Sequence, residues 1–214
     1  MILSRGRGYL FIHIPKTGGT SMALALEARA MKDDIMLGDT PKALKRRGKV
    51  QGIATRGRLW KHSTLADLEG LVGAEELPSL FKFTLVRNPW DRMVSYYHWL
   101  REQSFDHPSV ALAQAVEFAD FVRDPGTGRQ FRQSPASQYM TDAAGREQCD
   151  LYLRLEHFRD DVVALERHLG FAISLPQANI SPRKGDYRDY YTPGLRDLVA
   201  TLCAEDIARF GYRF

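Results

Sequence analysis

One cation, two glycines and three hydroxyl groups occupy six consecutive positions near the start of the chain, a combination suited to binding an anion. They are Lys16, Thr17, Gly18, Gly19, Thr20 and Ser21. A turn built from paired glycines can point successive backbone N–H groups into one concavity, and the positive end of a following helix adds to it. The lysine and the hydroxyls supply charge and further donors, so the pattern predicts a phosphate site. The alternative is a tight connection beside a solvated lysine.

The residues on either side must form the elements that hold this turn. Residues 9–14 are apolar or aromatic and predict a strand, and residues 19–32 carry apolar side chains densely enough for a helix packed on a sheet. In doubly wound α/β proteins, ligands bind outside the carboxyl ends of the strands. The turn differs from the nucleoside-triphosphate loop G-x-x-x-x-G-K-[ST], because Lys16 precedes the glycines, and no G-x-G-x-x-G turn is present.

A second strand-to-helix junction follows later in the chain. Residues 80–86 are β-branched and aromatic, and we expect them to form a strand beside the first one in a parallel sheet. Asn88 is a good helix N-cap, Pro89 fits the first helical position, and Asp91 can complete the cap. Arg87 is thereby held at the carboxyl end of a strand.

Arg87 and Ser95 form the second candidate phosphate site. Arginine offers a planar, bidentate fork, and Ser95, two turns into the predicted helix, adds a neutral donor. The alternative is an ion pair between Arg87 and a carboxylate, with Ser95 as an ordinary helix residue.

Both motifs resemble those of one enzyme family. The segment PKTGGTS resembles the 5′-phosphosulfate loop of sulfotransferases that use 3′-phosphoadenosine 5′-phosphosulfate (PAPS), in particular the heparan and chondroitin O-sulfotransferase-like branch, sulfotransferase family 2. The segment VRNPWDRMVSYY resembles the 3′-phosphate-binding segment of the same family. The resemblance implies one α/β domain over residues 1–214, with a central parallel sheet flanked by helices in a P-loop-like sulfotransferase fold.

The resemblance also implies the roles of these residues. Lys16 neutralises the bridging oxygen as its bond to sulfur breaks, and the 5′-phosphate is held by the backbone from Thr17 to Thr20 with the hydroxyls of Thr20 and Ser21. The donor is PAPS, and no metal is needed. The acceptor carries a hydroxyl group, and the basic loops together with the resembled branch favour a glycan as this acceptor. The 3′-phosphate is held by Arg87, Ser95, Arg183 and Lys184.

Arg183 and Lys184 are included because, with Gly185, they resemble an R-K-G turn that reaches the 3′-phosphate in many sulfotransferases. A solvated basic turn is the alternative for this segment. The closing FGYRF resembles the C-terminal end of the bacterial branch.

His62 is the candidate general base. The residues around it resemble a K-H-[SAT] segment that contains the catalytic histidine of bacterial members, and a pKa near 6.5 suits a base at working pH. Thr64 and Asp67 have the form of a capping box, so we expect a helix over residues 65–72, with His62 in the loop before it. The alternatives are a structural or solvated histidine and, as in some family members, a glutamate base. His13 is expected to be packed in the first strand.

The rest of the chain predicts further elements. We expect a helix over residues 109–123, a loop over 124–136, a strand over 149–155, a helix over 156–169 ended by Gly170, and a last helix over 192–210. In the resembled family, variable segments line the acceptor cleft. The candidate acceptor contacts here are Arg129, Arg132, Gln133 and Gln138.

Composition limits the remaining possibilities. The 214 residues carry a formal net charge of +4, a mild excess that suits an anionic ligand and falls short of a nucleic-acid-binding signature. Cys149 and Cys203 are expected to be buried free thiols, and no His or Cys cluster predicts a metal site. Residues 38–58 are rich in Lys and Arg and form either a solvated surface or one that recruits an acidic acceptor.

We expect a cytoplasmic protein, because no apolar run reaches membrane-spanning length and the first predicted strand leaves no room for a signal peptide. Eukaryotic members of the resembled branch are Golgi proteins with an N-terminal anchor. We therefore expect this chain either to be a bacterial-type member or to have been trimmed.

Two other functions compete with PAPS-dependent sulfuryl transfer. A nucleotide-dependent kinase would need a lysine after the glycines, which is absent. A non-catalytic nucleotide- or polyanion-binding module would keep the phosphate sites without turnover, and the presence of both Lys16 and His62 argues against it.

Overall fold

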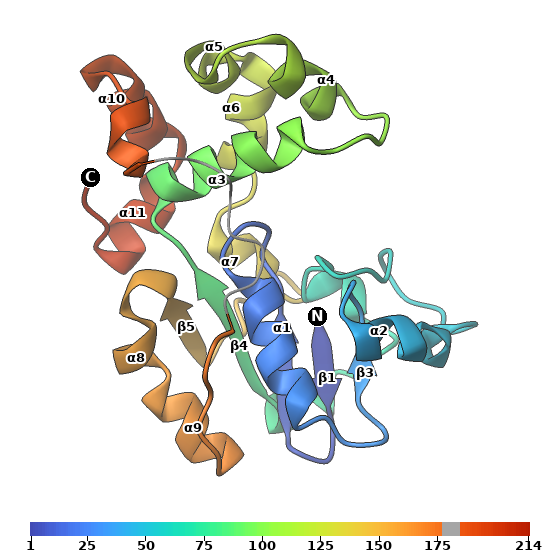
Figure 1. Ribbon diagram of the computed structural model, residues 1–214. Coiled ribbons are helices and arrows are strands. Elements are labelled where there is room, and N and C mark those ends of the chain that lie inside the picture. Colours follow the sequence, from blue (N-terminus) through green and yellow to red (C-terminus); the bar gives the residue numbers. More distant parts are fainter. Residues whose placement is uncertain (177–184) are drawn as a thin grey trace. The chain divides into compact units, whose positions relative to one another are not determined.

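The computed structural model describes residues 1–176 and 185–214, which divide into two compact units (Figure 1). The first unit contains Met1–Val86 and residues 136–176. The second contains Arg87–Pro135 and residues 185–214. The first unit carries the sheet, and the second is helical.

A five-stranded sheet forms the centre of the described part of the first unit, in the order β3-β1-β2-β4-β5. The strands are β1 (Ile2–Ser4), β2 (Tyr9–Ile12), β3 (Ile35–Met36), β4 (Phe81–Val86) and β5 (Leu151–Arg154). β2 pairs with β4 in parallel, as does β4 with β5, whereas β1 runs antiparallel to both of its neighbours. The mostly parallel sheet confirms the predicted α/β fold class.

The two strands predicted before the phosphate motifs lie side by side. Tyr9 pairs with Phe81 and Ile12 with Thr84, so the carboxyl ends of β2 and β4 meet at one edge of the sheet. The strand predicted over residues 149–155 is β5. β1 is an addition that the sequence did not predict, because three residues are too few to show the alternation of a half-buried strand.

Short helices surround this sheet (Figure 1). They are α1 (Gly19–Ala28), α2 (Pro41–Arg46), α7 (Ala136–Tyr139), α8 (Phe158–Asp161) and α9 (Val163–Leu169). Successive residues of β2 point to opposite faces, as the period of two requires. Phe11 is buried on one face with Met22 of α1 and Leu165 of α9, whereas Ile12 is buried on the other face with Leu68. Both faces of the sheet are therefore covered.

The helix predicted over residues 65–72 is wrong, because the chain makes only a 3₁₀ turn at Ala66–Leu68. The capping box itself forms: the Thr64 N–H donates to the Asp67 carboxylate at 2.7 Å, and the Asp67 N–H donates to the Thr64 hydroxyl at 3.3 Å. Gly70 then leaves the helical region with φ of 98°, and a Cβ there would collide with a backbone oxygen of a neighbouring loop. A turn signal after the cap thus outweighs the apolar periodicity.

The helix predicted over residues 156–169 is divided into a 3₁₀ turn at Leu155–His157, α8 and α9. Asp161 at the end of α8 turns back to Arg154, accepting from its N–H at 2.9 Å and from its guanidinium at 2.7 and 2.9 Å. Gly170 ends α9 in the left-handed conformation, as predicted.

Helices form the second unit and pack around an aromatic cluster. They are α3 (Pro89–Arg101), α4 (Pro108–Ala115), α5 (Phe118–Arg123), α6 (Pro125–Arg132), α10 (Pro193–Leu202) and α11 (Ala204–Phe210). Tyr97 of α3 and Phe121 of α5 have ring centroids 5.3 Å apart and are buried with Val199 of α10. Asn88 caps α3 as predicted, since its side chain accepts from the Trp90 N–H.

The single helix predicted over residues 109–123 is wrong. Val116 and Glu117 are extended and separate α4 from α5. The N-cap of α4 is His107, whose side chain accepts from the N–H of Ser109, the residue expected to be the cap. A β-branched valine followed by an extended glutamate interrupts the apolar period here.

The loop predicted over residues 124–136 is also wrong, because α6 occupies most of it. Asp124 accepts a first-turn N–H, and Pro125 takes the first helical position, so a strong helix start outweighs the cost of the two glycines that follow. The last helix, predicted over residues 192–210, is confirmed at its start but breaks at Cys203 into α10 and α11.

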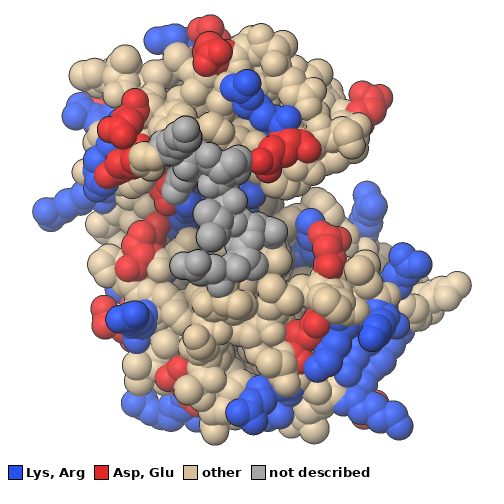
Figure 2. Space-filling model, viewed as in Figure 1, with Lys and Arg blue, Asp and Glu red and all other residues tan. Residues whose placement is uncertain are grey.

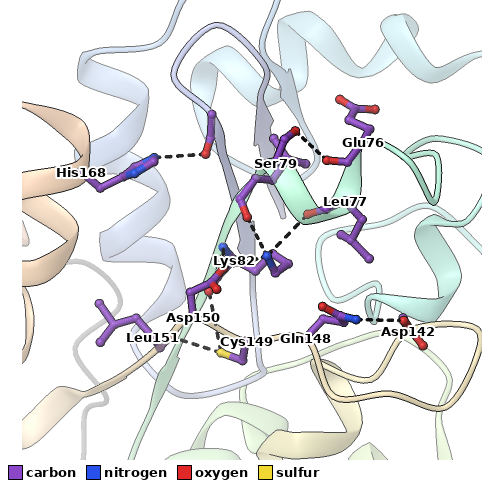
Figure 3. Close-up of polar contacts among 12 residues, drawn as sticks. Glu76, Leu77, Ser79, Lys82, Asp142, Gln148, Cys149, Asp150, Leu151 and His168 are labelled. Atoms are coloured by element: carbon purple, nitrogen blue, oxygen red, sulfur yellow. Dashed lines mark hydrogen bonds and ion pairs between the residues drawn. The ribbon is translucent and has the colours of Figure 1, made fainter.

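A buried lysine fixes β4 to the start of β5. The Lys82 ammonium group, with only 5% of its side chain exposed, lies 2.8 Å from the Asp150 carboxylate and donates to the Leu80 carbonyl at 2.7 Å (Figure 3). The same carboxylate accepts from the Lys82 backbone N–H at 2.7 Å, and the Asp150 N–H donates to the Lys82 carbonyl at 2.8 Å. The pair therefore sets the register of β4 against β5.

We predict that Asp150→Ala lowers the free energy of unfolding by about 2 kcal/mol, because it leaves a buried ammonium group without its counter-charge. Lys82→Met should cost about 1 kcal/mol or less, since an apolar side chain of similar length removes the charge that needs compensation. Urea unfolding of the two variants measures the difference. Equal losses would show that the pair does not fix the register.

Candidate functional site

The loop between β2 and α1 curls back on itself. The Thr17 hydroxyl donates to the Ile14 carbonyl at 2.9 Å in a buried position, so Thr17 offers an anion its backbone N–H rather than its hydroxyl. Lys16 and Gly18 both adopt the left-handed conformation, with φ of 66° and 88°. Within residues 1–176 and 185–214, Lys16 is the only non-glycine residue with a positive φ. Strain of this kind concentrates at functional sites.

The first turn of α1 presents the donors that an anion needs. Gly18 is the N-cap and provides no side-chain hydrogen bond, and the Met22 N–H makes the first helical bond to the Gly18 carbonyl at 3.2 Å. The N–H groups of Gly19, Thr20 and Ser21 precede that bond, in the positions that lack intrahelical acceptors. The loop therefore runs into an open helix N-terminus, the geometry that favours a phosphate group.

The imidazole of His13 fills the space beside Gly19. A Cβ built on Gly19 would collide with the Cδ2 and Nε2 atoms of His13, and a Cβ on Gly18 would lie 2.9 Å from the Leu155 Cδ1 atom. The glycine pair is therefore required by close packing as well as by backbone conformation. His13 is buried, as predicted, but it follows β2 and packs against the loop. The only signal that could have placed His13 in the site is its position two residues before Pro15.

His62 lies against His13. Its Nδ1 atom is 2.7 Å from the His13 carbonyl oxygen, and the ring centroids are 4.6 Å apart with the rings edge to face. A carbonyl can only accept, so Nδ1 carries the proton and the neutral ring has its free lone pair on Nε2. The Trp60 ring lies edge-on to His62 at 5.0 Å. His62, His13 and Gly19 thus form one contiguous group in the first unit.

Burial keeps both imidazoles neutral. It lowers the pKa of His62 to about 4, although the hydrogen bond to the His13 carbonyl works in the opposite direction. Burial also lowers the pKa of His13 well below its usual value, and the charge of Lys16 adds to this effect. The pKa near 6.5 expected for His62 is thereby corrected, and at neutral pH His62 is in the neutral form that can accept a proton.

The second predicted motif belongs to the other unit. Arg87 follows β4 directly, and its Nε and Nη2 atoms lie 2.8 and 2.7 Å from the Asp91 carboxylate. Asp91, which was expected to complete the cap of α3, lies in the first turn of that helix and pairs with Arg87. Ser95 is buried on α3. The ion pair named above as the alternative for Arg87 therefore forms. A phosphate bound by Arg87 would contact a guanidinium group that a carboxylate already orients.

The other predicted contacts are dispersed. Arg183 and Lys184 lie outside the described residues. Arg129 and Arg132 are exposed on α6, a helix rather than the predicted loop, and Gln133 follows it. Gln138 is exposed on α7 in the first unit. The predicted acceptor residues thus come from both units.

Within residues 1–176 and 185–214, no group of three or more His, Cys, Asp or Glu side chains could hold a metal ion. Cys149 and Cys203 are free thiols, the first half-buried and the second buried, and burial raises the pKa of each to about 12. Among the helices of the described residues, none combines the length and the apolar character of a membrane span.

Comparison with models of protein families identifies the family of this chain. The family model described as "Sulfotransferase family" matches residues 1–213. The crystal structure of mouse sulfotransferase SULT7A1 complexed with PAP has the same fold, with a TM-score of 0.50 and 16% sequence identity, over 95% of this chain and 84% of that chain. No curated protein sequence matches the chain.

We predict that acidification destabilises the protein because of the buried imidazoles. The folded pKa of His62 is about 4 and its unfolded value is about 6.5, so the unfolded state binds more protons between these values, and stability is lost as the pH falls through this window. Between pH 7.5 and 5, His62 alone should lower the free energy of unfolding by about 2 kcal/mol. Urea unfolding across this range should show a shallower slope for His62→Gln. An unchanged slope would contradict the assignment of a depressed pKa to His62.

Proposed function

The chain belongs to the sulfotransferase family, and on that premise we propose that it transfers the sulfuryl group of PAPS to a hydroxyl group, most suitably that of a carbohydrate, by in-line displacement. It is a PAPS-dependent sulfotransferase, and we propose that residues 1–214 act as one sulfotransferase domain. The proposal rests on one observation above the others: His62, His13 and Gly19 form a contiguous group at the start of α1.

The turn at α1 would hold the 5′-phosphosulfate. The backbone N–H groups from Thr17 to Thr20, together with the hydroxyls of Thr20 and Ser21, would donate to the 5′-phosphate. The Lys16 ammonium group would neutralise the bridging oxygen, on which negative charge develops as the bond to sulfur breaks. The open N-terminus of α1 and the strained backbone at Lys16 support these roles.

His62 would act as the general base. As the acceptor oxygen forms its bond to sulfur, the hydroxyl proton would pass to Nε2 of His62, and the electrons of the breaking S–O bond would remain on the 5′-phosphate of the departing 3′,5′-adenosine bisphosphate (PAP). The hydrogen bond from Nδ1 to the His13 carbonyl supports this role, because it fixes the tautomer with a free lone pair on Nε2.

The 3′-phosphate would be bound by residues of the second unit. Arg87 and Ser95 would supply a guanidinium fork and a hydroxyl, and Arg183 and Lys184 would add positive charge. The ion pair with Asp91 supports the role of Arg87, since a carboxylate on one side of a guanidinium fixes the direction of its remaining donors.

The acceptor is proposed by chemical class alone. The family requires a nucleophilic group that can accept a sulfuryl group, and the basic loops together with the branch resemblance favour a carbohydrate hydroxyl. Incubating the enzyme with sulfur-labelled PAPS and a panel of glycans, phenols and small alcohols would identify it. Label appearing only on phenols would redirect the proposal from carbohydrate to aryl sulfation.

We predict that PAP raises the melting temperature and ATP with Mg²⁺ does not. A ligand present at 100 times its dissociation constant stabilises the native state by about 2.7 kcal/mol, which a thermal shift assay detects readily. Lys16→Ala together with Arg87→Ala should abolish the response, whereas Arg123→Ala on the exposed end of α5 should leave it intact.

The same assay separates the competing functions. A response to ATP with Mg²⁺ and none to PAP would favour a nucleotide-dependent kinase. A response to PAP without label transfer to any acceptor in the panel would favour a non-catalytic nucleotide-binding module.

We predict that His62→Ala lowers kcat by roughly 10²- to 10⁴-fold, the usual contribution of a general base, and leaves the affinity for PAP nearly unchanged. Turnover with the identified acceptor and isothermal titration with PAP measure the two quantities. His157→Ala is the matched control, because His157 is an exposed histidine of the same unit. Near wild-type turnover in His62→Ala would remove His62 from the mechanism.

A further inference from the structure

The positive charge of the chain is concentrated in one segment. Residues 40–58 contain seven Lys and Arg residues and no Asp or Glu. The remaining residues have 23 basic and 26 acidic side chains, so they carry a net charge of −3 while the whole chain carries +4. In Figure 2, blue Lys and Arg side chains gather over α2 and the end of α1.

Three of these cations donate to backbone carbonyls at the end of α1 and in the loop that follows it. Lys42 Nζ donates to the Glu27 carbonyl at 2.6 Å, Arg46 Nη1 donates to the Met31 carbonyl at 2.7 Å, and Lys49 Nζ donates to the Lys32 carbonyl. Of the three acceptors only Glu27 belongs to α1, where the helix dipole favours a cation near the C-terminal end. The segment is therefore held in place by part of its own charge.

The outer side of the same segment exposes both basic and hydrophobic side chains. Lys45 and Arg47 are exposed, and Leu44 between Ala43 and Lys45 has 50% of its surface open to solvent. Six large hydrophobic residues are exposed in the described part of the chain, and four of them lie within residues 31–60. These four are Met31, Leu44, Ile53 and Trp60.

The neighbouring carboxylates leave most of this charge uncompensated. Asp34 is buried and accepts from the Met31 N–H at 2.7 Å, and Asp39 pairs with Lys61. Asp33 is exposed. Asp33 and Glu69, whose carboxylate lies 3.6 Å from the Arg56 guanidinium, are the acidic groups opposed to the seven cations of residues 40–58.

We propose that this surface, residues 40–60 with Met31, docks on an anionic lipid bilayer. Cations near such a membrane gain from its negative surface potential, and exposed aliphatic and Trp side chains insert at the boundary between headgroups and acyl chains. A soluble anionic polysaccharide would match the charge but would give Leu44, Ile53 and Met31 no apolar partner. The interspersed hydrophobic residues therefore favour the bilayer.

The docking surface borders the candidate base. Arg58 lies over the Trp60 ring with its guanidinium carbon 5.8 Å from the centroid, and the Trp60 ring contacts His62 edge-on. The polar end of an inserted tryptophan stays at the headgroup level. Docking through Trp60 would thus bring His62 close to headgroups of the bilayer.

The test is co-sedimentation of the full chain with vesicles of phosphatidylcholine alone and of phosphatidylcholine with ~30% phosphatidylserine. We expect binding to the anionic vesicles only, weakened when salt is raised to about 0.5 M. Lys45→Glu with Arg47→Glu, and separately Leu44→Glu, should each lower the partition coefficient by roughly tenfold or more.

Matched controls lie on the other side of the same unit. Arg159→Glu with Arg167→Glu changes the net charge equally, and Val163→Glu alters a residue of 49% exposure, so both should stay within about twofold of wild type. Each variant is first checked for an unchanged melting temperature, and alanine replaces glutamate where it is not. Absence of binding to anionic vesicles, equal loss in the controls, or tighter binding to dextran sulfate that survives Leu44→Glu would each overturn the proposal.

Discussion

The close packing of the His13 imidazole on Gly19 is the contact on which the candidate site depends. It occupies the space of a side chain at the start of α1, so the turn must have glycine there. The backbone of the same histidine holds His62 through its carbonyl oxygen. One residue therefore connects the candidate phosphate-binding turn to the candidate base, and it does so through shape and a hydrogen bond rather than through charge.

The environment of this contact also determines the protonation of the site. A histidine exposed to water would be partly charged near neutral pH, whereas burial of His62 and His13 strongly disfavours the imidazolium form. A base must be unprotonated before it can accept a proton, and the cation that stabilises the leaving group should be a separate residue. The proposed mechanism divides these tasks between His62 and Lys16.

The two ends of the parallel strands have different functions. At the amino ends, the ion pair of the buried Lys82 with Asp150 and its backbone bonds fix β4 against β5. At the carboxyl end of β2, the chain leaves the sheet into a strained loop with an open helix terminus. A strained backbone persists only where the surrounding structure holds it in place. The rigid pairing of β4 with β5 at the amino ends therefore helps to maintain the strained loop at the carboxyl end of β2.

Much of this protein was determined by local sequence. The strands at β2 and β4, the turn at Gly18 and Gly19, the cap at Asn88 and the end of α9 at Gly170 all follow from residue types at short spacing. These features depend on interactions within a few residues, which a single sequence displays directly.

Tertiary structure alone decided the rest. The 3₁₀ turn after Thr64, the break between α4 and α5 and the strand β1 all contradict or extend what periodicity indicated. The contact of His13 with both Gly19 and His62 joins residues up to 49 positions apart. Such contacts arise only when the folded chain brings distant side chains into the same volume, and no local pattern of residues encodes which ones will meet.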